Sequence, residues 1–327
     1  MYGVEIKDYS GFSKIEYISR RERKKKSKNR LQKISFFFIL FAIILFLVSV
    51  QVINFNISKT KKEVLSAVSK ITKLNLDNGL EKAVLDSLKG SKGTYAVAIK
   101  NLNTGESYYL NEHKKFEAAS LYKNWIMATV FGQIETGKIS RDEILKKDIA
   151  KLNEEFEIAT ESAEMTEGEI EVSVIQALIG MITISHNYDA LILTDRVRLS
   201  SVRSFLAESG LNESSVGSPP LITAYDASLF FEKLYKQELA SPESTKEMID
   251  FLKKQTLNNK IPKFLPEDLV IAHKTGELGS FTHDAGIVYT PKGNYIIAIL
   301  SESNYPSGAE ENISKISKVV YDYFSAK

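Results

Sequence analysis

Three predicted β-strands follow one another near the carboxyl end of the chain. They lie in the sequence LVIAHKTGELGSFTHDAGIVYTPKGNYIIAILS, which covers residues 269–301. Strand signals occupy residues 269–274, 285–290 and 295–301, and a Pro-Lys-Gly turn at residues 291–293 separates the last two. The stretch therefore predicts three strands that belong to one sheet.

Two more strands are predicted at residues 95–99 and 107–110, on either side of a turn. Between the early and late strands, about residues 135–260 read as mostly helical, and a closing helix fits residues 309–324. All five strands can join one sheet only if the helical block is an excursion from it. We therefore predict an α+β fold in which helices flank an antiparallel five-stranded sheet, with an inserted all-helical lobe and a site in the seam between the two.

The amino-terminal segment has the pattern of a membrane anchor. Residues 1–33 hold eleven Lys or Arg and four Asp or Glu, while residues 34–58 carry no charge. As a helix, ~20 apolar residues span the ~30 Å core of a bilayer. Because the basic residues precede the apolar run, the positive-inside rule places them in the cytoplasm.

Four segments follow from this pattern. We predict a basic cytoplasmic tail at residues 1–33, a transmembrane helix in the lipid bilayer at 34–54, a helical lead-in segment at 55–92 and an extracytoplasmic domain at 93–327. A cleavable signal peptide fits less well, because the apolar run is long and lacks a small-residue cleavage pattern.

Composition excludes several other classes of protein. The tail carries +7 of a total net charge of +2, so the remainder is mildly acidic, which argues against nucleic-acid binding. The absence of cysteine excludes disulfides and thiolate catalysis. The four histidines lack the spacing of metal ligands, and we predict neither a metal nor a cofactor.

A serine and a lysine three residues apart form the first chemical motif, Ser120-Leu121-Tyr122-Lys123. We predict a helix that begins near Ser120, so that both side chains share one face. A serine nucleophile needs a base, and burial or a neighbouring cation such as Lys274 would lower the pKa of Lys123 toward that task. Taken alone, the pattern also fits a helix cap at Ser120 beside a solvated Lys123.

The second motif is Ser185-His186-Asn187, which follows an apolar predicted helix. Ser185 can relay a proton to a leaving nitrogen, and Asn187 can hold a substrate amide. In isolation the same residues also fit a buried, hydrogen-bonded turn.

The third motif, Lys274-Thr275-Gly276, is predicted to end a strand. A cation and a hydroxyl there can clamp a substrate carboxylate, and glycine permits close approach of another backbone. The backbone N–H of Glu277, together with that of Ser120, would form an oxyanion hole.

These motifs resemble those of the class A β-lactamase and penicillin-binding superfamily. The resemblance covers roughly residues 60–327 and rests on the three motifs in order, on the hairpin before Ser120, and on the sequences at residues 272–279 and 283–289. It implies a β-lactamase-like fold, an acyl-enzyme on Ser120, and β-lactams or peptidoglycan peptides ending in D-alanine as substrates.

Two departures from the family pattern stand out. His186 occupies the place where the family usually has Asp. Class A enzymes also use a Glu, usually in Glu-x-x-Leu-Asn, to activate the water that hydrolyses the acyl-enzyme. Glu208 matches that text but ends a predicted helix, and Glu213 is a second weak candidate. The acidic run at residues 154–171 is interpreted as a solvated face.

The leading hypothesis is a membrane-anchored, outward-facing serine hydrolase whose acyl-enzyme is slow to deacylate. A D,D-peptidase or transpeptidase acting on cell-wall peptides would use the same chemistry. A non-catalytic β-lactam or cell-wall sensor, with the basic tail as a docking element, is the alternative of another class. The intact set of three motifs argues against the sensor, since such a protein has no need of Lys123.

Overall fold

The computed structural model describes residues 79–327. The predicted basic tail and membrane helix, and most of the lead-in segment, lie outside the described residues. Within residues 79–327, no helix is both long and apolar enough to cross a bilayer.

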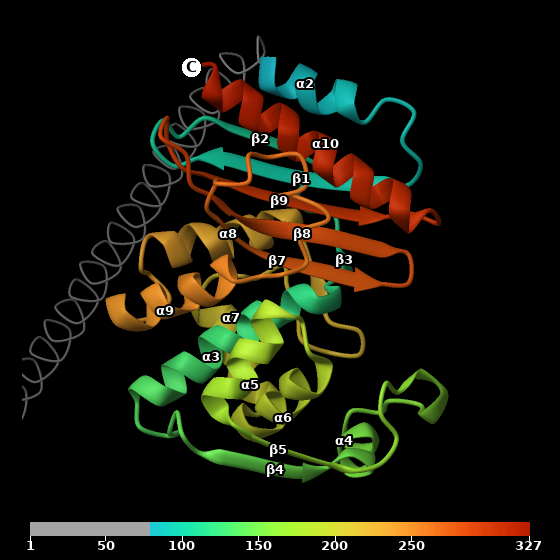
Figure 1. The fold of residues 1–327 in the computed structure, drawn as a ribbon, viewed down its shortest axis with the longest axis vertical. Helices are drawn as coiled ribbons and strands as arrows, with labels where there is room; N and C mark the ends of the chain where they lie inside the picture. Colours follow the sequence, from blue (N-terminus) through green and yellow to red (C-terminus); the bar gives the residue numbers. More distant parts are fainter. Residues whose placement is uncertain (1–78) are drawn as a thin grey trace, which may run out of the picture. The chain divides into compact units, whose positions relative to one another are not determined.

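The centre of the fold is an antiparallel sheet of five strands in the order β2-β1-β9-β8-β7 (Figure 1). Its strands are β1 (Thr94–Asn101), β2 (Ser107–Leu110), β7 (Ile271–Leu278), β8 (Phe281–Val288) and β9 (Tyr295–Glu302). β9 pairs with β1 over its whole length, so the first and last strands of the described residues lie side by side. The predicted α+β class and five-stranded antiparallel sheet are confirmed.

The strand that carries the third motif is longer than predicted. Lys274 was expected to end a strand, but β7 continues to Leu278, and Gly276 pairs with His283 of β8. Leu278 pairs directly with Phe281, so only two residues connect β7 and β8, and the first of them, Gly279, has φ +56°. A two-residue hairpin turn of this kind suits glycine, and it extends both strands past the motif.

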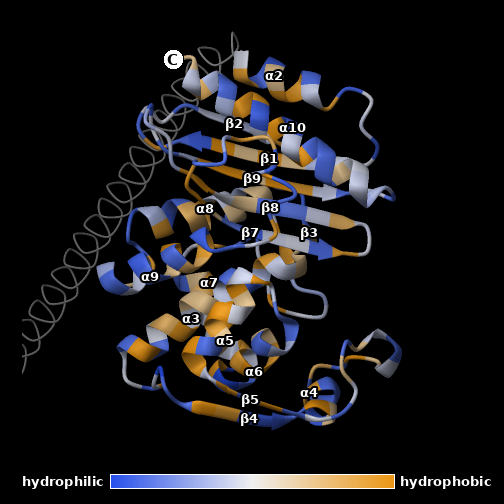
Figure 2. Cartoon of the chain, viewed as in Figure 1, coloured by the Kyte–Doolittle hydropathy of each residue, from blue (hydrophilic) through white to orange (hydrophobic). Residues whose placement is uncertain are grey.

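Helices cover both faces of the sheet. On one face α2 (Gly79–Ser87) and α10 (Pro306–Ser325) pack over a core that includes Ile297, Ile299 and Ile316. On the other face α8 (Ala224–Tyr235) packs against β1, β8 and β9, within the larger core that continues into the helical lobe. In Figure 2, α10 carries both hydrophobic and hydrophilic residues along its length, as expected of a helix with one buried side.

The inserted lobe is mainly helical, but the prediction that it is all-helical is wrong. Its helices are α3 (Lys123–Glu135), α4 (Ile149–Glu155), α5 (Val174–Thr183), α6 (Asn187–Val197), α7 (Leu199–Glu208) and α9 (Pro242–Lys253). An antiparallel pair, β4 (Ile144–Asp148) and β5 (Glu169–Ser173), crosses its outer end (Figure 1). Lys146 on β4 forms ion pairs with Glu169 and Glu171 on β5. All three side chains are more than half exposed, so this end of the acidic run is a solvated face whose charges are also cross-strand partners.

A second short pairing links two segments that are distant in sequence. β3 (Phe116–Glu117) pairs with β6 (Leu221–Ile222), and the N–H of Ala118 donates to the carbonyl of Pro220 at 2.8 Å. The loop before β6 is therefore held beside the residues that lead into Ser120.

Candidate active site

Ser120 lies in a 3₁₀ turn, η1 (Ala119–Tyr122), directly before α3. The preceding residue, Ala119, has φ +43°, a conformation that costs an alanine roughly 1–2 kcal/mol. Neither η1 nor α3 has a side-chain cap, so the alternative of Ser120 as a helix cap is not what the structure shows. Strained backbone of this kind commonly occurs at functional sites. Here the strained residue lies directly before Ser120.

His283 on β8 supports the entry to this turn. Its Nε2 lies 2.8 Å from the carbonyl of Glu117, and its Nδ1 accepts from the N–H of Ser301 at 3.2 Å. Burial lowers the pKa of His283 to about 4, so the ring is neutral at physiological pH. A neutral ring with hydrogen on Nε2 satisfies both contacts, which fixes the chain three residues before Ser120.

Lys123 is fully buried in the first turn of α3. Its Nζ donates to the carbonyl of Ser185 at 2.6 Å, to the Oγ of Ser185 at 3.2 Å and to Oδ1 of Asn187 at 2.6 Å. Burial lowers the pKa of Lys123 to about 8, against the opposing effect of Glu164 and Asp189. The solvated lysine of the alternative interpretation is therefore excluded.

Ser185 lies between two lysines. Its Oγ accepts from Nζ of Lys123 at 3.2 Å and from Nζ of Lys274 at 2.9 Å. The residue connects α5 to α6 with φ +59°, a second strained position at the site. The first, second and third motifs thus meet at one hydroxyl, although Ser185 is 62 residues from Lys123 and 89 from Lys274.

Lys274 is fully buried, and its Nζ also donates to the carbonyl of Thr275 at 2.9 Å. Burial, followed by the nearby charge of Lys123, lowers its pKa well below the ordinary value. The charge of Lys123 thus disfavours the charged form of Lys274, whereas the lowered pKa of Lys123 comes from burial and not, as the sequence predicted as an alternative, from Lys274. A carboxylate arriving at this place would restore the charge of Lys274, since an opposite charge favours the ammonium form.

Gly276 lets the third motif lie against the turn that carries the serine. A Cβ at this position would meet the carbonyl oxygen of Ala118 at 3.2 Å, Cβ of Ala119 at 3.3 Å and Cγ of Leu121 at 3.3 Å. Glu277 follows on β7, the outer strand of the sheet, and its carboxylate forms an ion pair with the fully buried Lys260. The pair holds the carboxylate of Glu277 in a local salt bridge.

His186 replaces the usual family Asp, and the structure supplies a carboxylate from the next turn. Nδ1 of His186 lies 2.9 Å from Oδ2 of Asp189 and 3.3 Å from its backbone nitrogen. The shorter distance favours an N–H that donates to the carboxylate. Burial raises the pKa of Asp189, and His186 acts against that rise. A Cβ on Gly180 would stand 2.0 Å from Oδ2 of Asp189, so glycine makes the room for this pair.

Neither proposed deacylation residue contacts the three motifs. Glu208 is exposed at the end of α7. Glu213 accepts from Oγ1 of Thr223 at 2.9 Å and lies 2.8 Å from Nδ1 of His113. The loop that is held beside Ser120, residues 214–220, reads Ser-Ser-Val-Gly-Ser-Pro-Pro and contains no carboxylate.

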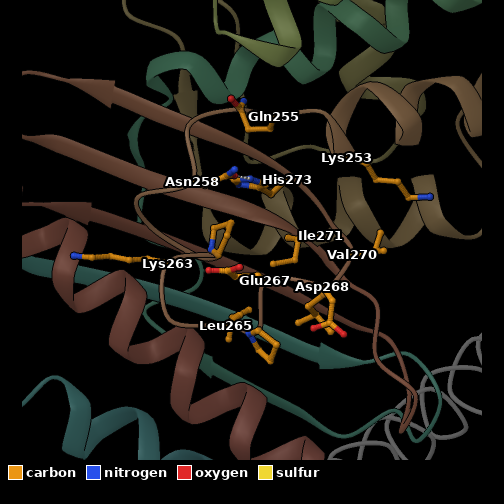
Figure 3. Close-up of a pocket in the computed structure, with 13 residues that line it drawn as sticks. Lys253, Gln255, Asn258, Lys263, Leu265, Glu267, Asp268, Val270, Ile271 and His273 are labelled. Atoms are coloured by element: carbon orange, nitrogen blue, oxygen red, sulfur yellow. Dashed lines mark hydrogen bonds between the residues drawn. The ribbon is translucent and has the colours of Figure 1, made fainter.

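A separate cavity of about 640 Å³ lies at the start of β7 and not at its motif (Figure 3). His273 lines this cavity. Its Nε2 lies 3.1 Å from Oδ1 of Asn258, which can only accept, and its Nδ1 lies 2.9 Å from Oδ1 of the buried Asp284. Both ring nitrogens thus have protein partners. Within residues 79–327, no cluster of three or more His, Asp or Glu side chains is placed to hold a metal.

Sequence reasoning missed one residue that reaches the site. Glu164, from the acidic run, accepts a hydrogen bond from Nδ2 of Asn187 at 2.5 Å. The pattern of the run gave no sign of this contact, because one carboxylate among many exposed ones has no distinguishing spacing.

A serine at a strained turn, two buried lysines and a second serine between them, on a sheet with an inserted lobe, define the class of serine acyl-transfer hydrolases. The chain belongs to the beta-lactamase enzyme family, whose model matches residues 79–324. It is a hydrolase of the serine β-lactamase type.

Known proteins of this kind resemble the chain over most of its length. "Beta-lactamase VEB-1" of Pseudomonas aeruginosa is 24% identical over 73% of this chain and 88% of its own. A structure of a variant of PBP-A, an acyl-enzyme complex with penicillin G, is 26% identical, with a TM-score of 0.69 over 77% of this chain and 98% of its own. A β-lactamase from Sphaerobacter thermophilus shares the fold, with 23% identity and a TM-score of 0.68 over 76% and 98% of the two chains.

Proposed function

We propose that this hydrolase forms an acyl-enzyme on Ser120 with β-lactams or related amides, and that it releases the acyl group slowly. The observation that carries the proposal is the position of Ser185 Oγ, which accepts from both Lys123 and Lys274. A proton taken from the nucleophile by one lysine can pass through this hydroxyl to a leaving nitrogen.

Each motif residue has a role in this mechanism. Lys123, whose pKa burial lowers to about 8, is the base that activates Ser120. The Oγ of Ser120 attacks the carbonyl carbon, the ring C–N bond breaks, and Ser185 delivers the proton to the nitrogen. The backbone N–H groups of Ser120 and Glu277 stabilise the oxyanion.

The remaining motif residues bind the substrate. Lys274 and Thr275 clamp the substrate carboxylate, and Gly276 lets β7 lie close enough for the clamp and the serine to share one ligand. Asn187 donates to the substrate amide.

Slow deacylation is proposed because residues 214–220, the loop beside Ser120, contain no carboxylate, and neither Glu208 nor Glu213 contacts a motif. Glu164 does contact a motif residue, since it accepts from Nδ2 of Asn187, but it comes from the loop before β5 and not from the loop beside Ser120. Residues 214–220 therefore lack the base that class A chemistry uses to activate water.

Intact-mass measurement tests both parts of the proposal. Purified protein mixed with penicillin G should gain the mass of one penicillin, located on Ser120 by peptide mapping, and lose it over many minutes or longer. Ser120→Ala should gain no mass. Rapid turnover without a detectable adduct contradicts slow deacylation, and labelling of Ser120→Ala contradicts the assigned nucleophile.

A second candidate function is D,D-peptidase activity on peptides that end in D-alanine. The absence of a carboxylate from residues 214–220, the loop beside Ser120, supports it. Release of D-alanine from a model pentapeptide by the wild type, and its loss in Ser120→Ala, would establish this activity; no release would leave β-lactams as the substrates.

We also propose that residues 34–54 anchor the enzyme in the cytoplasmic membrane, with residues 1–33 inside the cell and the hydrolase domain outside. The uncharged run and the +7 tail before it support this topology. The full chain should stay with membranes after an alkaline wash, and external protease should cleave the domain in spheroplasts. Extraction by the wash would contradict the anchor.

A further inference from the structure

The carbonyl groups at the end of α5 are hydrogen-bonded by a segment from a distant part of the chain. The last residues of a helix leave their carbonyl oxygens without partners inside the helix. Nε2 of Gln255 donates to the carbonyl of Ile182 at 2.9 Å. The N–H and the Oγ1 of Thr256 donate to the carbonyl of Thr183 at 2.9 and 3.1 Å. Ser185 follows two residues later, so these three hydrogen bonds hold the backbone that leads into it.

The conformation of Ser185 makes this external support necessary. Its φ of +59° is left-handed, which is unfavourable for a serine and persists only where surrounding contacts impose it. The N–H of His186 donates to the carbonyl of Gly180 at 3.1 Å, which is the local contact of the turn. Gln255 adds a contact from outside the turn, and it is only 4% exposed, so its amide is shielded from competing water.

The segment that carries these donors also contacts β7. Oδ1 of Asn258 accepts from Nε2 of His273 at 3.1 Å (Figure 3). His273 lies directly before Lys274 on β7. Residues 255–258 therefore connect the backbone before Ser185 to the residue before Lys274.

This connection bears on the distance between Ser185 and the two lysines. Oγ of Ser185 accepts from Nζ of Lys274 at 2.9 Å and from Nζ of Lys123 at 3.2 Å. Through these contacts the hydroxyl can regain the proton that it gives to a leaving nitrogen. A shift at the end of α5 would move this hydroxyl, whereas Ser120 and Lys123 are carried by other elements, η1 and α3.

We propose that Gln255 and Thr256 are positioning residues for Ser185, which keep its hydroxyl placed to protonate the leaving nitrogen of the substrate. The inference rests on the proposed function, because it assumes that Ser185 is the proton donor when Ser120 is acylated.

Two substrates with different leaving groups separate this role from a general effect on the protein. In both, Oγ of Ser120 bonds to the acyl carbon and the leaving group departs. The nitrogen of penicillin G needs a proton when its C–N bond breaks. A thioester instead releases a thiolate, which departs without a proton because a thiol has a pKa of only about 8.5.

The thioester of phenylacetylglycine with mercaptoacetate is the second probe, because it carries the same phenylacetamido group as penicillin G and also a carboxylate. Acylation of the full chain by penicillin G is followed by intact mass. Acylation by the thioester is followed by the thiol released in the first turnover, measured with a thiol reagent. The chain contains no cysteine, so the reagent reports only the leaving group.

Ser185→Ala sets the reference, and it should slow acylation by penicillin G about a hundredfold and acylation by the thioester far less. Gln255→Met and Thr256→Val should show the same selectivity, with penicillin G slowed about three- to tenfold and the thioester less than about twofold. Thr256→Ser keeps the hydroxyl and should have the wild-type rates. Thr136→Val removes a hydroxyl that donates to carbonyls at the end of α3, and it should change neither rate.

Equal slowing of both substrates in Gln255→Met and Thr256→Val would overturn the proposal, because lost stability or a displaced Ser120 acts on both reactions. Unchanged acylation by penicillin G in these variants would also overturn it. Thr256 is exposed, so Thr256→Val decides the question even if Gln255→Met does not fold. A wild type that reacts with neither substrate, or a Ser185→Ala variant without selectivity, would instead mean that the proposed function fails and this inference with it.

Discussion

At the scale of single residues, burial prepares Lys123 for its role. An exposed lysine stays protonated at neutral pH and cannot accept a proton from serine. Lys123 is fully buried, and its amine is bonded to three oxygens of Ser185 and Asn187. Desolvation outweighs the two acidic groups nearby and lowers the pKa to about 8. The site thus keeps a usable fraction of neutral amine.

The pH dependence of acylation follows from this pKa. If Lys123 acts as the base, only its neutral form is active, so the acylation rate should rise with pH and reach half its maximum near pH 8. Stopped-flow measurement of acylation from about pH 6 to about pH 10 would show this single rise. A rate that falls through pH 8 would mean that the protonated amine is the active form.

Removing Glu164 should move the same midpoint. The negative charge of Glu164 raises the pKa of Lys123, so Glu164→Gln should shift the rise to lower pH, whereas Glu167→Gln should leave it in place. A midpoint shared by all three proteins would mean that another group controls acylation.

His186 is matched to Asp189 and not to the family residue it replaces. Its Nδ1 lies 2.9 Å from the carboxylate, whose pKa burial already raises. Restoring the family residue with His186→Asp would place two carboxylates together. Near pH 7 the variant should be less stable than His186→Asn by about 1 kcal/mol, because both carboxyls are then ionised, and the gap should close near pH 4.

Urea unfolding of both variants at the two pH values measures this difference. An Asn side chain can cap α6 at its first turn as an Asp side chain can, but without adding charge, so the comparison isolates the repulsion. Equal stability of the two variants at pH 7 would show that Asp189 relaxes into solvent.

At the scale of elements, the sequence predicted correctly the helices and strands whose formation depends on local sequence patterns. The β-branched and aromatic residues of β1, β2, β8 and β9 and the turns between them predicted the sheet, although β8 begins at Phe281 and not at residue 285. The apolar run of α5 predicted a central helix. The ends of β7 and the strands β4 and β5 were missed, because their pairing depends on partners: His283 for Gly276, and Glu169 and Glu171 for Lys146.

The same distinction explains the candidate site. Ser120, Lys123, Ser185 and Lys274 were identified because each lies in a short motif. Glu164 was not, because its contact with Asn187 arises only when a loop anchored by Tyr188 folds back over α6. Residues 214–220 were likewise recognised as a loop beside the nucleophile only through the pairing of β6 with β3.

Substitution of Gly276 tests how closely β7 must approach η1 for acylation. In Gly276→Ala the new Cβ would lie 3.2–3.3 Å from Ala118, Ala119 and Leu121, so the strand or the turn must move by a few tenths of an ångström. We expect acylation to slow at least about tenfold, since reactions between positioned groups are sensitive to such shifts.

A matched control exists on α3. A Cβ on Gly132 meets no atom within 4 Å, so Gly132→Ala should leave acylation unchanged and stabilise the helix by roughly 0.5–1 kcal/mol. The acylation rates of both variants measure the effect on the site, and their thermal unfolding measures the effect on stability. Unchanged acylation in Gly276→Ala would show that the close approach of β7 is not required.

At the scale of the whole molecule, the sheet separates two hydrophobic cores, of which only one supports the elements that carry the motifs. The core under α10 and α2 contains none of the three motifs, and Ile316 belongs to it. The core on the other face continues from the sheet into the lobe, and it includes Leu178 of α5, the helix that ends just before Ser185. Only the second core lies between the elements that bring the motifs together.

Two truncations of equal burial should therefore separate stability from activity. Leu178 and Ile316 are both fully buried, so Leu178→Ala and Ile316→Ala should each lower the free energy of unfolding by about 2–5 kcal/mol. Only Leu178→Ala should also slow acylation of the folded protein, because a cavity beneath α5 lets Ser185 shift between the two lysines. Urea unfolding gives the first quantity, and the acylation rate at a temperature where both variants stay folded gives the second. Equal slowing in both variants would mean that the motifs depend on the rigidity of the whole sheet and not on the core that they share.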